Sequence, residues 1–334
     1  MVSSLVSLIS KKIIKPSILT PPTKKSHKLS FVDQVMHMSI PMAFFYPKIG
    51  NYEPTHVPQI LENSLSKLLS FYYPYAGRLN KDDANYVDCN DMGVELSHVH
   101  VHCPMSHILR QPYTNSDHVV FPVEQPYAHM NEGNLATTQL KSRVNQKFKI
   151  LLEVVSALLY KCALVARGVN DSGSFKPSSL FQVANMRHRL NPPLSYDTCG
   201  NILSGYFVET NNEKDVNCSK MVGEMKKGKL NLHPKESALV KSIKKGKTPF
   251  YSNDEVDNYF CSSLIEFPLY KVDFGWGRPI RVGMGAGPFD KFFILLDNQS
   301  GDGVEVIVML DEQNMAIFER DLELLEFASP ITNL

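Results

Sequence analysis

The stretch Asp273-Phe274-Gly275-Trp276-Gly277-Arg278-Pro279 constrains the fold more than any other part of this 334-residue chain. It holds the only tryptophan, which stands between two glycines and close to a phenylalanine. Glycine lets the backbone follow a tight path, and tryptophan offers a large surface for packing. No side chain in the stretch is a suitable base near neutral pH. The pattern therefore predicts a packed structural loop, with a direct role in chemistry as the weaker alternative.

Hydrophobic periodicity predicts an α/β protein without internal repeats. Apolar residues recur at helical spacing over 57–71, with polar residues between them, so one face of this helix is expected to pack on a sheet. The other segments predicted to be helical are 151–167, 215–229, 237–245 and 312–325. Alternating or continuous apolar runs predict strands over 1–10, 86–89, 94–102, 179–186, 258–267, 292–296 and 304–310.

The composition predicts a globular intracellular protein, and the length predicts about two domains. With 43% hydrophobic residues, 21% charged residues and a net charge of +1, the chain shows no signature of disorder and no electrostatic attraction for nucleic acid. No stretch reaches the ~18 apolar residues that span a bilayer, so we expect a cytoplasmic protein without a membrane partner. The six cysteines lack Cys-x-x-Cys spacing and are expected to be reduced thiols.

Further motifs lie on both sides of the middle of the chain, and together with the Asp273–Gly277 signature they resemble the BAHD acyltransferases of plants. The order and spacing of the motifs are those of the family. Their residues are similar to those of the branch that includes vinorine synthase and acylsugar acyltransferases. The motifs are Leu29-Ser30-x-x-Asp33-Gln34, Phe71-Tyr72-Tyr73-Pro74-x-Ala76-Gly77-Arg78-Leu79, Asp88-Cys89-Asn90-Asp91-x-Gly93-Val94, Asn185-Met186-Arg187-x-Arg189-x-Asn191-Pro192-Pro193-Leu194, Gly200-Asn201 and Ser300-Gly301-Asp302-Gly303-Val304-Glu305.

The resemblance implies a two-domain architecture like that of chloramphenicol acetyltransferase, with mixed sheets flanked by helices. We assign residues 1–140 to an N-terminal acyltransferase domain and residues 141–334 to a C-terminal one that carries the signature. The resemblance also implies a reaction, the transfer of an acyl group from a coenzyme A thioester to an alcohol. Acyl-CoA is then a co-substrate and not a permanently bound cofactor, the acceptor is a small molecule, and the expected state is a monomer.

The family's catalytic motif, His-x-x-x-Asp, is absent from this chain, because none of the 11 histidines has an aspartate four residues later. A hydroxyl that attacks a thioester must lose a proton as the new bond forms, and histidine is the side chain best matched to accept it near neutral pH. The sequence departs from the family between Leu140 and Lys141 and is roughly a hundred residues short of two full domains. We therefore predict an incomplete N-terminal domain without a catalytic histidine.

The resemblance places further expectations on two arginines and one loop. In the family the motif aspartate is a structural partner of an arginine in the Asn-x-Arg-x-Arg segment, so Arg187 or Arg189 is expected to lack its salt-bridge partner. Ser300 and Asp302 are expected near coenzyme A, although a simple hairpin turn explains their loop equally well.

Other patterns in the sequence favour structural explanations over chemical ones. His98, His100 and His102 share one face of a predicted strand with Cys103 nearby, but equal spacing on an exposed strand needs no metal, and no metal site is predicted. The glycine-rich segment 283–287 lacks the full Gly-x-Gly-x-x-Gly spacing and a following helix that dinucleotide binding requires. A Gly-x-Ser-x-Gly nucleophile motif does not occur, which excludes the serine-hydrolase interpretation.

We therefore expect an acyl-CoA-dependent acyltransferase of plant specialised metabolism whose turnover is impaired. One alternative is a non-catalytic protein that binds acyl-CoA or a partner through its C-terminal half, and another is a non-functional splice or gene variant. Residual catalysis by a substitute such as His129 or His188 is a weaker alternative. Loss of central strands from the N-terminal domain also predicts exposed sheet edges and apolar surface there.

Overall fold

The computed structural model describes residues 5–35, 41–48, 56–110, 135–142, 152–170, 175–233, 238–244, 255–284 and 291–330. The α-helices are α1 (Phe31–Val35), α2 (Val57–Phe71), α3 (Met105–Arg110), α5 (Leu152–Asn170), α6 (Cys218–Leu230), α7 (Ala238–Lys244), α8 (Glu312–Phe318) and α9 (Leu322–Phe327). The 3-10 helices are η2 (Pro22–Lys24), η4 (Tyr73–Ala76), η5 (Arg187–Arg189), η6 (Glu213–Asp215) and η7 (Leu269–Lys271). The strands are β1 (Val6–Ile14), β2 (Ser26–Lys28), β3 (Met42–Phe45), β4 (Arg78–Leu79), β5 (Tyr86–Asp88), β6 (Val94–Val101), β7 (Leu135–Ser142), β8 (Ser178–Asn185), β9 (Leu203–Thr210), β10 (Asp257–Ser263), β11 (Arg281–Met284), β12 (Phe292–Asp297), β13 (Val304–Asp311) and β14 (Ala328–Pro330).

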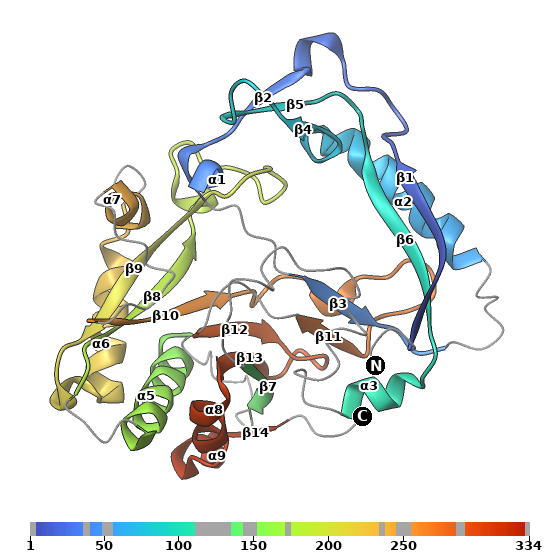
Figure 1. The fold of residues 1–334 in the computed structure, drawn as a ribbon. Coiled ribbons are helices and arrows are strands. Elements are labelled where there is room, and N and C mark those ends of the chain that lie inside the picture. The colour runs from blue at the N-terminus through green and yellow to red at the C-terminus, as the bar shows by residue number, and fades with distance from the viewer. Residues whose placement is uncertain are drawn as a thin grey trace.

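A seven-stranded mixed sheet organises the C-terminal half of the chain (Figure 1). Its strand order is β14-β7-β13-β12-β10-β8-β9. β10 is parallel to β8 and to β12, whereas the other neighbouring pairs are antiparallel. The α/β class predicted from the sequence, with mixed sheets flanked by helices, is confirmed.

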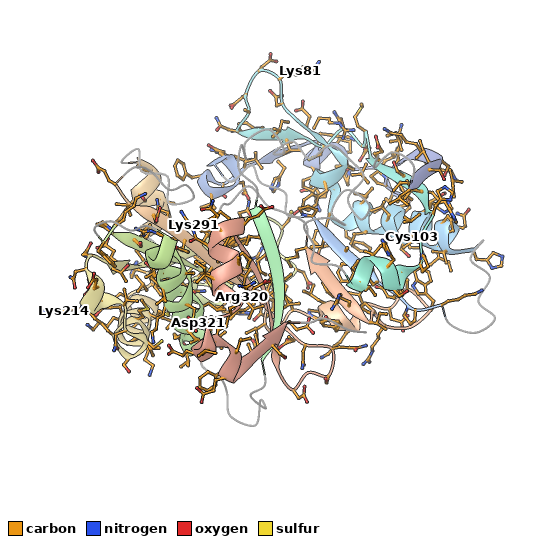
Figure 2. All side chains as sticks on the ribbon, turned by 60° about the horizontal axis from the view of Figure 1, so that its bottom comes forward. Lys81, Cys103, Lys214, Lys291, Arg320 and Asp321 are labelled. Atoms are coloured by element: carbon orange, nitrogen blue, oxygen red, sulfur yellow. The ribbon has the colours of Figure 1, made fainter. Side chains whose placement is uncertain are left out.

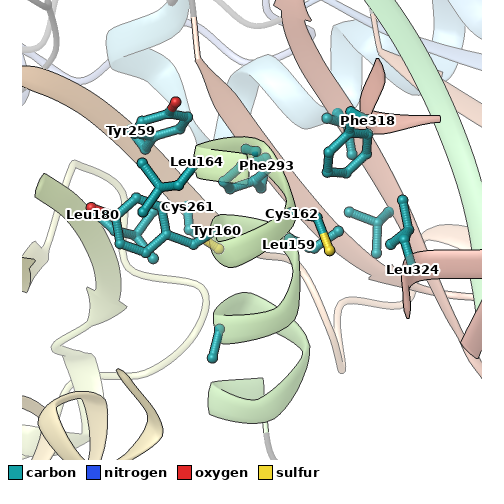
Figure 3. Close-up of a cluster of buried hydrophobic side chains, with 14 of the residues drawn as sticks. Leu159, Tyr160, Cys162, Leu164, Leu180, Tyr259, Cys261, Phe293, Phe318 and Leu324 are labelled. Carbon is teal, nitrogen blue, oxygen red and sulfur yellow. The ribbon is translucent and has the colours of Figure 1, made fainter. Parts of the chain in front are cut away.

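The large sheet is buried on both faces because its central strands carry apolar residues at successive positions. On β12, Phe293 and Leu295 pack on the face covered by α5, together with Tyr259 and Phe318 (Figure 3). Phe292, Ile294 and Leu296 belong to a separate cluster on the opposite face. One sheet thus separates two hydrophobic cores, which explains why β12 has no polar face.

The N-terminal part contains smaller sheets. β1 and β6 form a two-stranded ribbon, and β2, β5 and β4 form a three-stranded sheet. Helix α2 packs its Leu65 and Leu69 against Ile14 of β1 and against Val94 and Leu96 of β6. A two-stranded ribbon is marginal in water, so this helix supplies much of its support.

Strand β3 joins the N-terminal part to the C-terminal half. It pairs antiparallel with β11, with Phe45 opposite Arg281 and Met42 opposite Met284. The backbone N–H of Ile280 extends the pairing by donating to the Phe45 carbonyl at 2.8 Å. Residues more than two hundred positions apart therefore share one sheet.

Most predicted elements are present, and the differences have local causes. The predicted helix 312–325 is divided into α8 and α9 because Asp321 (Figure 2) starts a new helix, its carboxylate accepting from the Leu324 N–H at 3.0 Å. The helix predicted from 215 begins at Cys218, since the Asn217 side chain caps it by accepting from the Lys220 N–H at 3.1 Å. The first strand, predicted over 1–10, is described at Val6–Ile14 and so extends further than predicted, while positions 1–4 lie outside the described residues.

Strand β7 runs through positions 140 and 141 without interruption. It pairs with β13 on one side, where Leu140 is opposite Val306 and Lys141 is opposite Glu305, and with β14 on the other side. The point at which the sequence is expected to depart from the family pattern therefore lies inside a strand of the large sheet. In the part of the chain that the structure describes, no helix has the length and apolar character needed to cross a membrane.

Candidate functional site

The signature loop is closed by its own aspartate. The Asp273 carboxylate accepts hydrogen bonds from the backbone N–H groups of Gly275 and Gly277, at 2.7 and 3.0 Å. Both glycines have positive φ angles, 103° and 99°, which other residues rarely adopt. A Cβ added at Gly275 meets no atom within 4 Å, so the backbone conformation and not crowding requires glycine there.

The aromatic residues of the signature pack on the chain that follows β3. The rings of Phe274 and Trp276 stack with centroids 5.3 Å apart, and Tyr46 contacts both edge-on at 6.2 and 6.1 Å. The Tyr46 hydroxyl donates to the Val272 carbonyl at 3.2 Å, and partial burial together with Asp273 raises the pKa of Tyr46. The loop thus joins the two halves of the chain, and its geometry supports the structural interpretation of the signature.

Arg187 holds together the loop that connects β8 to β9. Its Nη2 donates to the carbonyls of Thr198 and Gly200, both at 2.8 Å, and its Nε also reaches Thr198, at 3.3 Å. Its Nη1 lies 3.4 Å from the side-chain oxygen of Asn185. None of these partners within the described residues is a carboxylate. That Arg187 has lost a salt-bridge partner stays a prediction.

Arg189, two residues after Arg187, contacts a different part of the structure. Its Nη1 donates to the Lys229 carbonyl at 3.4 Å, at the C-terminal end of α6, where a cation is favoured by the helix dipole. The side chain is exposed, which limits the strength of this contact. The structure therefore does not bring the two predicted arginines to a common partner.

The sequence predicts no specific role for Asp33, yet this residue links α1 to the loop after η5. One carboxylate oxygen accepts from the backbone N–H and hydroxyl of Ser30, at 3.0 and 2.6 Å, in the manner of a capping box. The other oxygen accepts from the Asn201 N–H at 2.6 Å. Gly200 has a φ of 113°, and a Cβ there would lie 3.4 Å from the same carboxylate. Two of the quoted sequence motifs, Leu29–Gln34 and Gly200–Asn201, thus meet in space.

Tyr75 in η4 belongs to the same group of residues. Desolvation of the phenol, followed by the effects of the Cys199 thiol and of Asp33, raises the pKa of Tyr75 to about 12, although Arg187 opposes the shift. The phenol therefore carries its proton at neutral pH and is not a base there. The only signal in the sequence for this group was that its members stand in or next to the quoted motifs.

Ser300 and Asp302 lie in the tight turn between β12 and β13. The turn is organised by Asn298, which is 2% exposed and whose side-chain oxygen accepts from the N–H groups of Asp302 and Gly303, at 3.0 and 3.1 Å. Its side-chain nitrogen donates to the Asp302 carboxylate at 2.8 Å, and Gly301 has a φ of 73°. This geometry supports the hairpin-turn alternative, and contact with coenzyme A stays a prediction.

The histidines of β6 are exposed and form no metal centre within the described residues, where no group of three metal-ligating side chains occurs. The rings of His100 and His102 are 4.6 Å apart, and His102 shares a 2.9 Å hydrogen bond with Ser7. Cys103 (Figure 2) follows the same strand. His188 is also exposed and packs on Tyr196 at 4.3 Å. His129 and positions 285–287 lie outside the described residues.

Comparison with known proteins gives matches over most of the chain. The pattern described as the Transferase family matches residues 4–131 and 97–325. Acyltransferase Pun1 of Capsicum frutescens is 34% identical, with 97% of this chain and 98% of that protein covered. Acylsugar acyltransferase 3 of Solanum lycopersicum is 31% identical, with the same shares covered. The crystal structure of vinorine synthase is similar in fold, with a TM-score of 0.78 at 22% identity over 98% of this chain and 100% of that one.

The alignments also show a difference in length. The match with Pun1 extends over 439 positions, whereas this chain has 334 residues, so at least 105 aligned positions have no residue here. The match with acylsugar acyltransferase 3 extends over 431 positions. The matches cover 98% of each relative, so the missing positions are internal to the alignment.

Proposed function

Because this chain belongs to the BAHD acyltransferases of the Transferase family, we propose that it derives from an enzyme of alcohol acylation and has itself lost normal turnover. The family transfers acyl groups from coenzyme A thioesters in plant specialised metabolism. The observation that supports the loss of turnover is the absence of the His-x-x-x-Asp motif from all 334 residues. Acyl-CoA as co-substrate and a small-molecule alcohol as acceptor are part of the same proposal.

The chemistry explains why this absence is decisive. The acceptor oxygen attacks the thioester carbonyl and loses its proton to a base, a tetrahedral intermediate forms, and the carbon–sulfur bond then breaks to release coenzyme A as thiolate. Asp273 is engaged by its own loop, Tyr75 holds its proton at neutral pH, and His188 packs on an exposed tyrosine. Without the base, the expected loss of rate is about 10²- to 10⁴-fold.

An internal deletion next to Leu140 accounts for both the lost motif and the long alignments. We infer from the sequence motifs that the chain follows the family up to this residue and again from helix α5 onwards. The match with Pun1 contains at least 105 positions without a residue here, which supports a deletion of about that size. A single deletion of that size, as from exon skipping, is simpler than gradual loss. We therefore propose a splice or gene variant of an intact acyltransferase.

The direct test is an assay of coenzyme A release from acetyl-CoA with a panel of alcohols. We expect kcat/KM at least about a hundredfold below that of a full-length relative on the same panel. Circular dichroism on the same preparation establishes that the chain is folded. A value within about tenfold of the relative contradicts the proposal.

A second candidate function is non-catalytic binding of acyl-CoA through the C-terminal half. The large sheet, buried on both faces by two cores, supports this candidate because such a platform does not depend on the lost motif. Calorimetric titration with coenzyme A distinguishes the alternatives. Saturable binding without turnover favours a binding protein, whereas no binding and no cooperative unfolding favours a non-functional product.

Oligomeric state and compartment belong to the proposal as well. We expect a monomer by light scattering and a cytoplasmic distribution of a fluorescent fusion in plant cells. The family resemblance supports the first expectation. Dimers at micromolar concentration, or a fusion confined to an organelle, contradict the respective expectation.

A further inference from the structure

Three polar side chains interrupt the hydrophobic core between the large sheet and helix α5. Gln182 of β8 is directly opposite Tyr206 of β9 on one side and Cys261 of β10 on the other. Directly opposite residues of neighbouring strands share a face, and Tyr206 and Cys261 belong to the cluster covered by α5. These three residues therefore form a polar row beneath the helix.

Two residues of α5 approach this row from above. The Ser156 hydroxyl lies 3.4 Å from the Cys261 sulfur, and Glu153 precedes Ser156 by about one helical turn. Glu153 binds Lys229 of α6 through Oε1 at 2.7 Å. Burial raises the pKa of Glu153, but the hydrogen bond and charge of Lys229 outweigh it and hold the pKa below its usual value. Glu153 is therefore ionised and only accepts hydrogen bonds.

Two oxygen atoms in this cluster lack a donor. They are Oε2 of Glu153 and Oε1 of Gln182, and their side chains are only 3% and 2% exposed. The amide nitrogen of Gln182 already donates to the Cys261 carbonyl, at 3.4 Å. Such unsatisfied acceptors are rare in folded proteins, because each costs about 1–3 kcal/mol.

The Tyr206 hydroxyl is a donor in the same region. Tyr206 and Cys261 flank Gln182, and Lys229, which binds Glu153, follows the residue of α6 that packs on the Tyr206 ring. Burial, then the charges of Glu153 and of the Cys261 group, raise the pKa of Tyr206. Its ring is fixed against α6, because a Cβ at Gly228 would lie 2.4 Å from Tyr206 Cδ2. Among the described residues no hydrogen bond of this hydroxyl occurs. The charged groups that face the phenol are Glu153 and Arg189.

We propose that this cluster is a binding site for one internal water molecule, which donates to Gln182 Oε1 and Glu153 Oε2 and accepts from the Tyr206 hydroxyl. A water molecule offers two donors and can accept two hydrogen bonds, so it matches two acceptors and one donor. An anion would be repelled by both acceptors. The charge of Glu153 is already balanced by Lys229, which removes the need for a cation.

This water connects elements that the apolar packing alone does not fix. It would link α5 through Glu153, β8 through Gln182 and β9 through Tyr206, and Lys229 extends the link to α6. Gln182 also lies three residues before Asn185, where the segment held by Arg187 begins. The water site would therefore fix the position of α5 and α6 over β8 and β9, close to the point where the segment held by Arg187 begins.

A crystal structure of the full chain at about 1.5 Å resolution tests the proposal. We expect a density peak within about 2.6–3.2 Å of both Gln182 Oε1 and Glu153 Oε2. A direct hydrogen bond between the Tyr206 hydroxyl and Gln182, or no density beside these acceptors, overturns the proposal. A peak with the short distances and high density of a metal cation overturns it as well.

A double-mutant cycle in solution provides a test that needs no crystals. Gln182→Met and Tyr206→Phe are near-isosteric and each removes one partner of the water, so each is expected to lower Tm by roughly 2–4 °C. The double variant should lose clearly less than the sum of the two shifts, because the second change removes a partner of a water that is already displaced. Additive shifts contradict the proposal.

The control pair is Gln182→Met with Tyr160→Phe. The Tyr160 hydroxyl bonds Thr210 at 3.0 Å and belongs to a different polar group under the same helix. Its shift in Tm should add to that of Gln182→Met. Coupling in the control pair of the same size as in the test pair would show a general effect of the core and overturn the assignment.

Discussion

At the scale of single residues, the side chains of the Asp273–Gly277 signature serve the structure of the chain. Asp273 is the loop's own hydrogen-bond acceptor, and Trp276 and Phe274 are held by Tyr46 from the other half of the chain. None of these contacts involves a reacting group. The signature is therefore expected to contribute to the stability of the chain, whether or not the chain has activity.

Replacing Asp273 by alanine removes the acceptor for two backbone N–H groups. We expect the free energy of unfolding to fall by about 1–2 kcal/mol, measured by urea denaturation. Asp273→Asn keeps an acceptor oxygen and should lose about half as much. An alanine variant as stable as the original chain would show that the loop does not depend on this carboxylate.

Two glycines with equally open surroundings should respond to alanine with opposite signs. At Gly275 nothing crowds a Cβ, but its φ of 103° is strained for alanine, so Gly275→Ala should lower the free energy of unfolding by about 1–3 kcal/mol. At Gly168 in α5 nothing crowds a Cβ either and the backbone is helical, so Gly168→Ala should raise it by about 0.4–1 kcal/mol. Equal effects at both positions would refute the backbone argument.

Some residue-scale features could be predicted and others could not. The structural role of the loop could be predicted, because the glycines beside Trp276 accept the backbone angles of a tight loop and the tryptophan offers a large surface for packing. The contact of Asp33 with Asn201 could not be predicted, because it joins positions 168 residues apart and depends on how the two parts of the chain fold together. For Ser300 and Asp302 the sequence predicted either contact with coenzyme A or a simple hairpin turn. The contacts of Asn298 favour the hairpin turn.

At the scale of elements, Asp257 ties together the beginnings of three parallel strands. It opens β10 and pairs with Arg167 of α5 at 2.8 Å, with Lys176 before β8 at 3.1 Å and with Lys291 (Figure 2) before β12 at 3.1 Å. Asp257 is buried, with 4% of the residue exposed. Burial raises the pKa of Asp257, but the surrounding cations, Lys291 first, outweigh it and hold the pKa below its usual value.

This depressed pKa gives a defined dependence of stability on pH. The contribution of Asp257 is complete above the pKa of an unfolded aspartate, about 3.9, and is lost as the pH falls through the lower pKa of the folded state. Asp257→Asn should remove this acid-dependent part and, at pH 7, lower the free energy of unfolding by about 3 kcal/mol. Urea denaturation between pH 7 and pH 2 measures both effects.

Glu224→Gln is the matched control for the Asp257 variant. Glu224 pairs with Lys227 at 2.7 Å on the exposed side of α6, where an ion pair contributes about 0–1 kcal/mol. Its removal should leave the free energy of unfolding nearly unchanged at pH 7. If both variants lose the same free energy of unfolding, burial does not explain the contribution of the Asp257 ion pairs to stability.

The periodicity of the sequence predicted most elements because burial determines the pattern. Helix α2 has the predicted bounds, 57–71, since its apolar face packs on the β1–β6 ribbon. Boundaries were less accurate where side-chain caps decide them, as at Asn217 and Asp321. Strand pairing was not predicted, because the partners of β3 and β7 lie more than a hundred residues away.

At the scale of the whole molecule, the N-terminal part carries much of the exposed apolar surface. Leu8, Ile9 and Ile13 of β1 are 62%, 57% and 53% exposed, and Phe71 at the end of α2 is 80% exposed. Exposed apolar side chains favour association where they lie side by side. The predicted loss of a central segment would leave such exposed apolar surface, and that loss stays a prediction.

The genomic locus tests whether that segment was deleted. We expect DNA between the codons for Leu140 and Lys141 to encode about a hundred residues that include a His-x-x-x-Asp motif. Amplification and sequencing of genomic DNA and transcript across these codons provide the measurement. Contiguous codons in the genome would place the loss in the gene itself and contradict a splicing origin.

The central claim is that this chain, although an acyltransferase by descent, lacks the base for normal turnover. The most direct measurement compares kcat/KM for acyl transfer from acetyl-CoA in three proteins: this chain, a full-length relative, and that relative with its motif histidine changed to alanine. We predict that this chain and the alanine variant are both at least about a hundredfold below the relative. A value for this chain within about tenfold of the full-length relative would contradict the account.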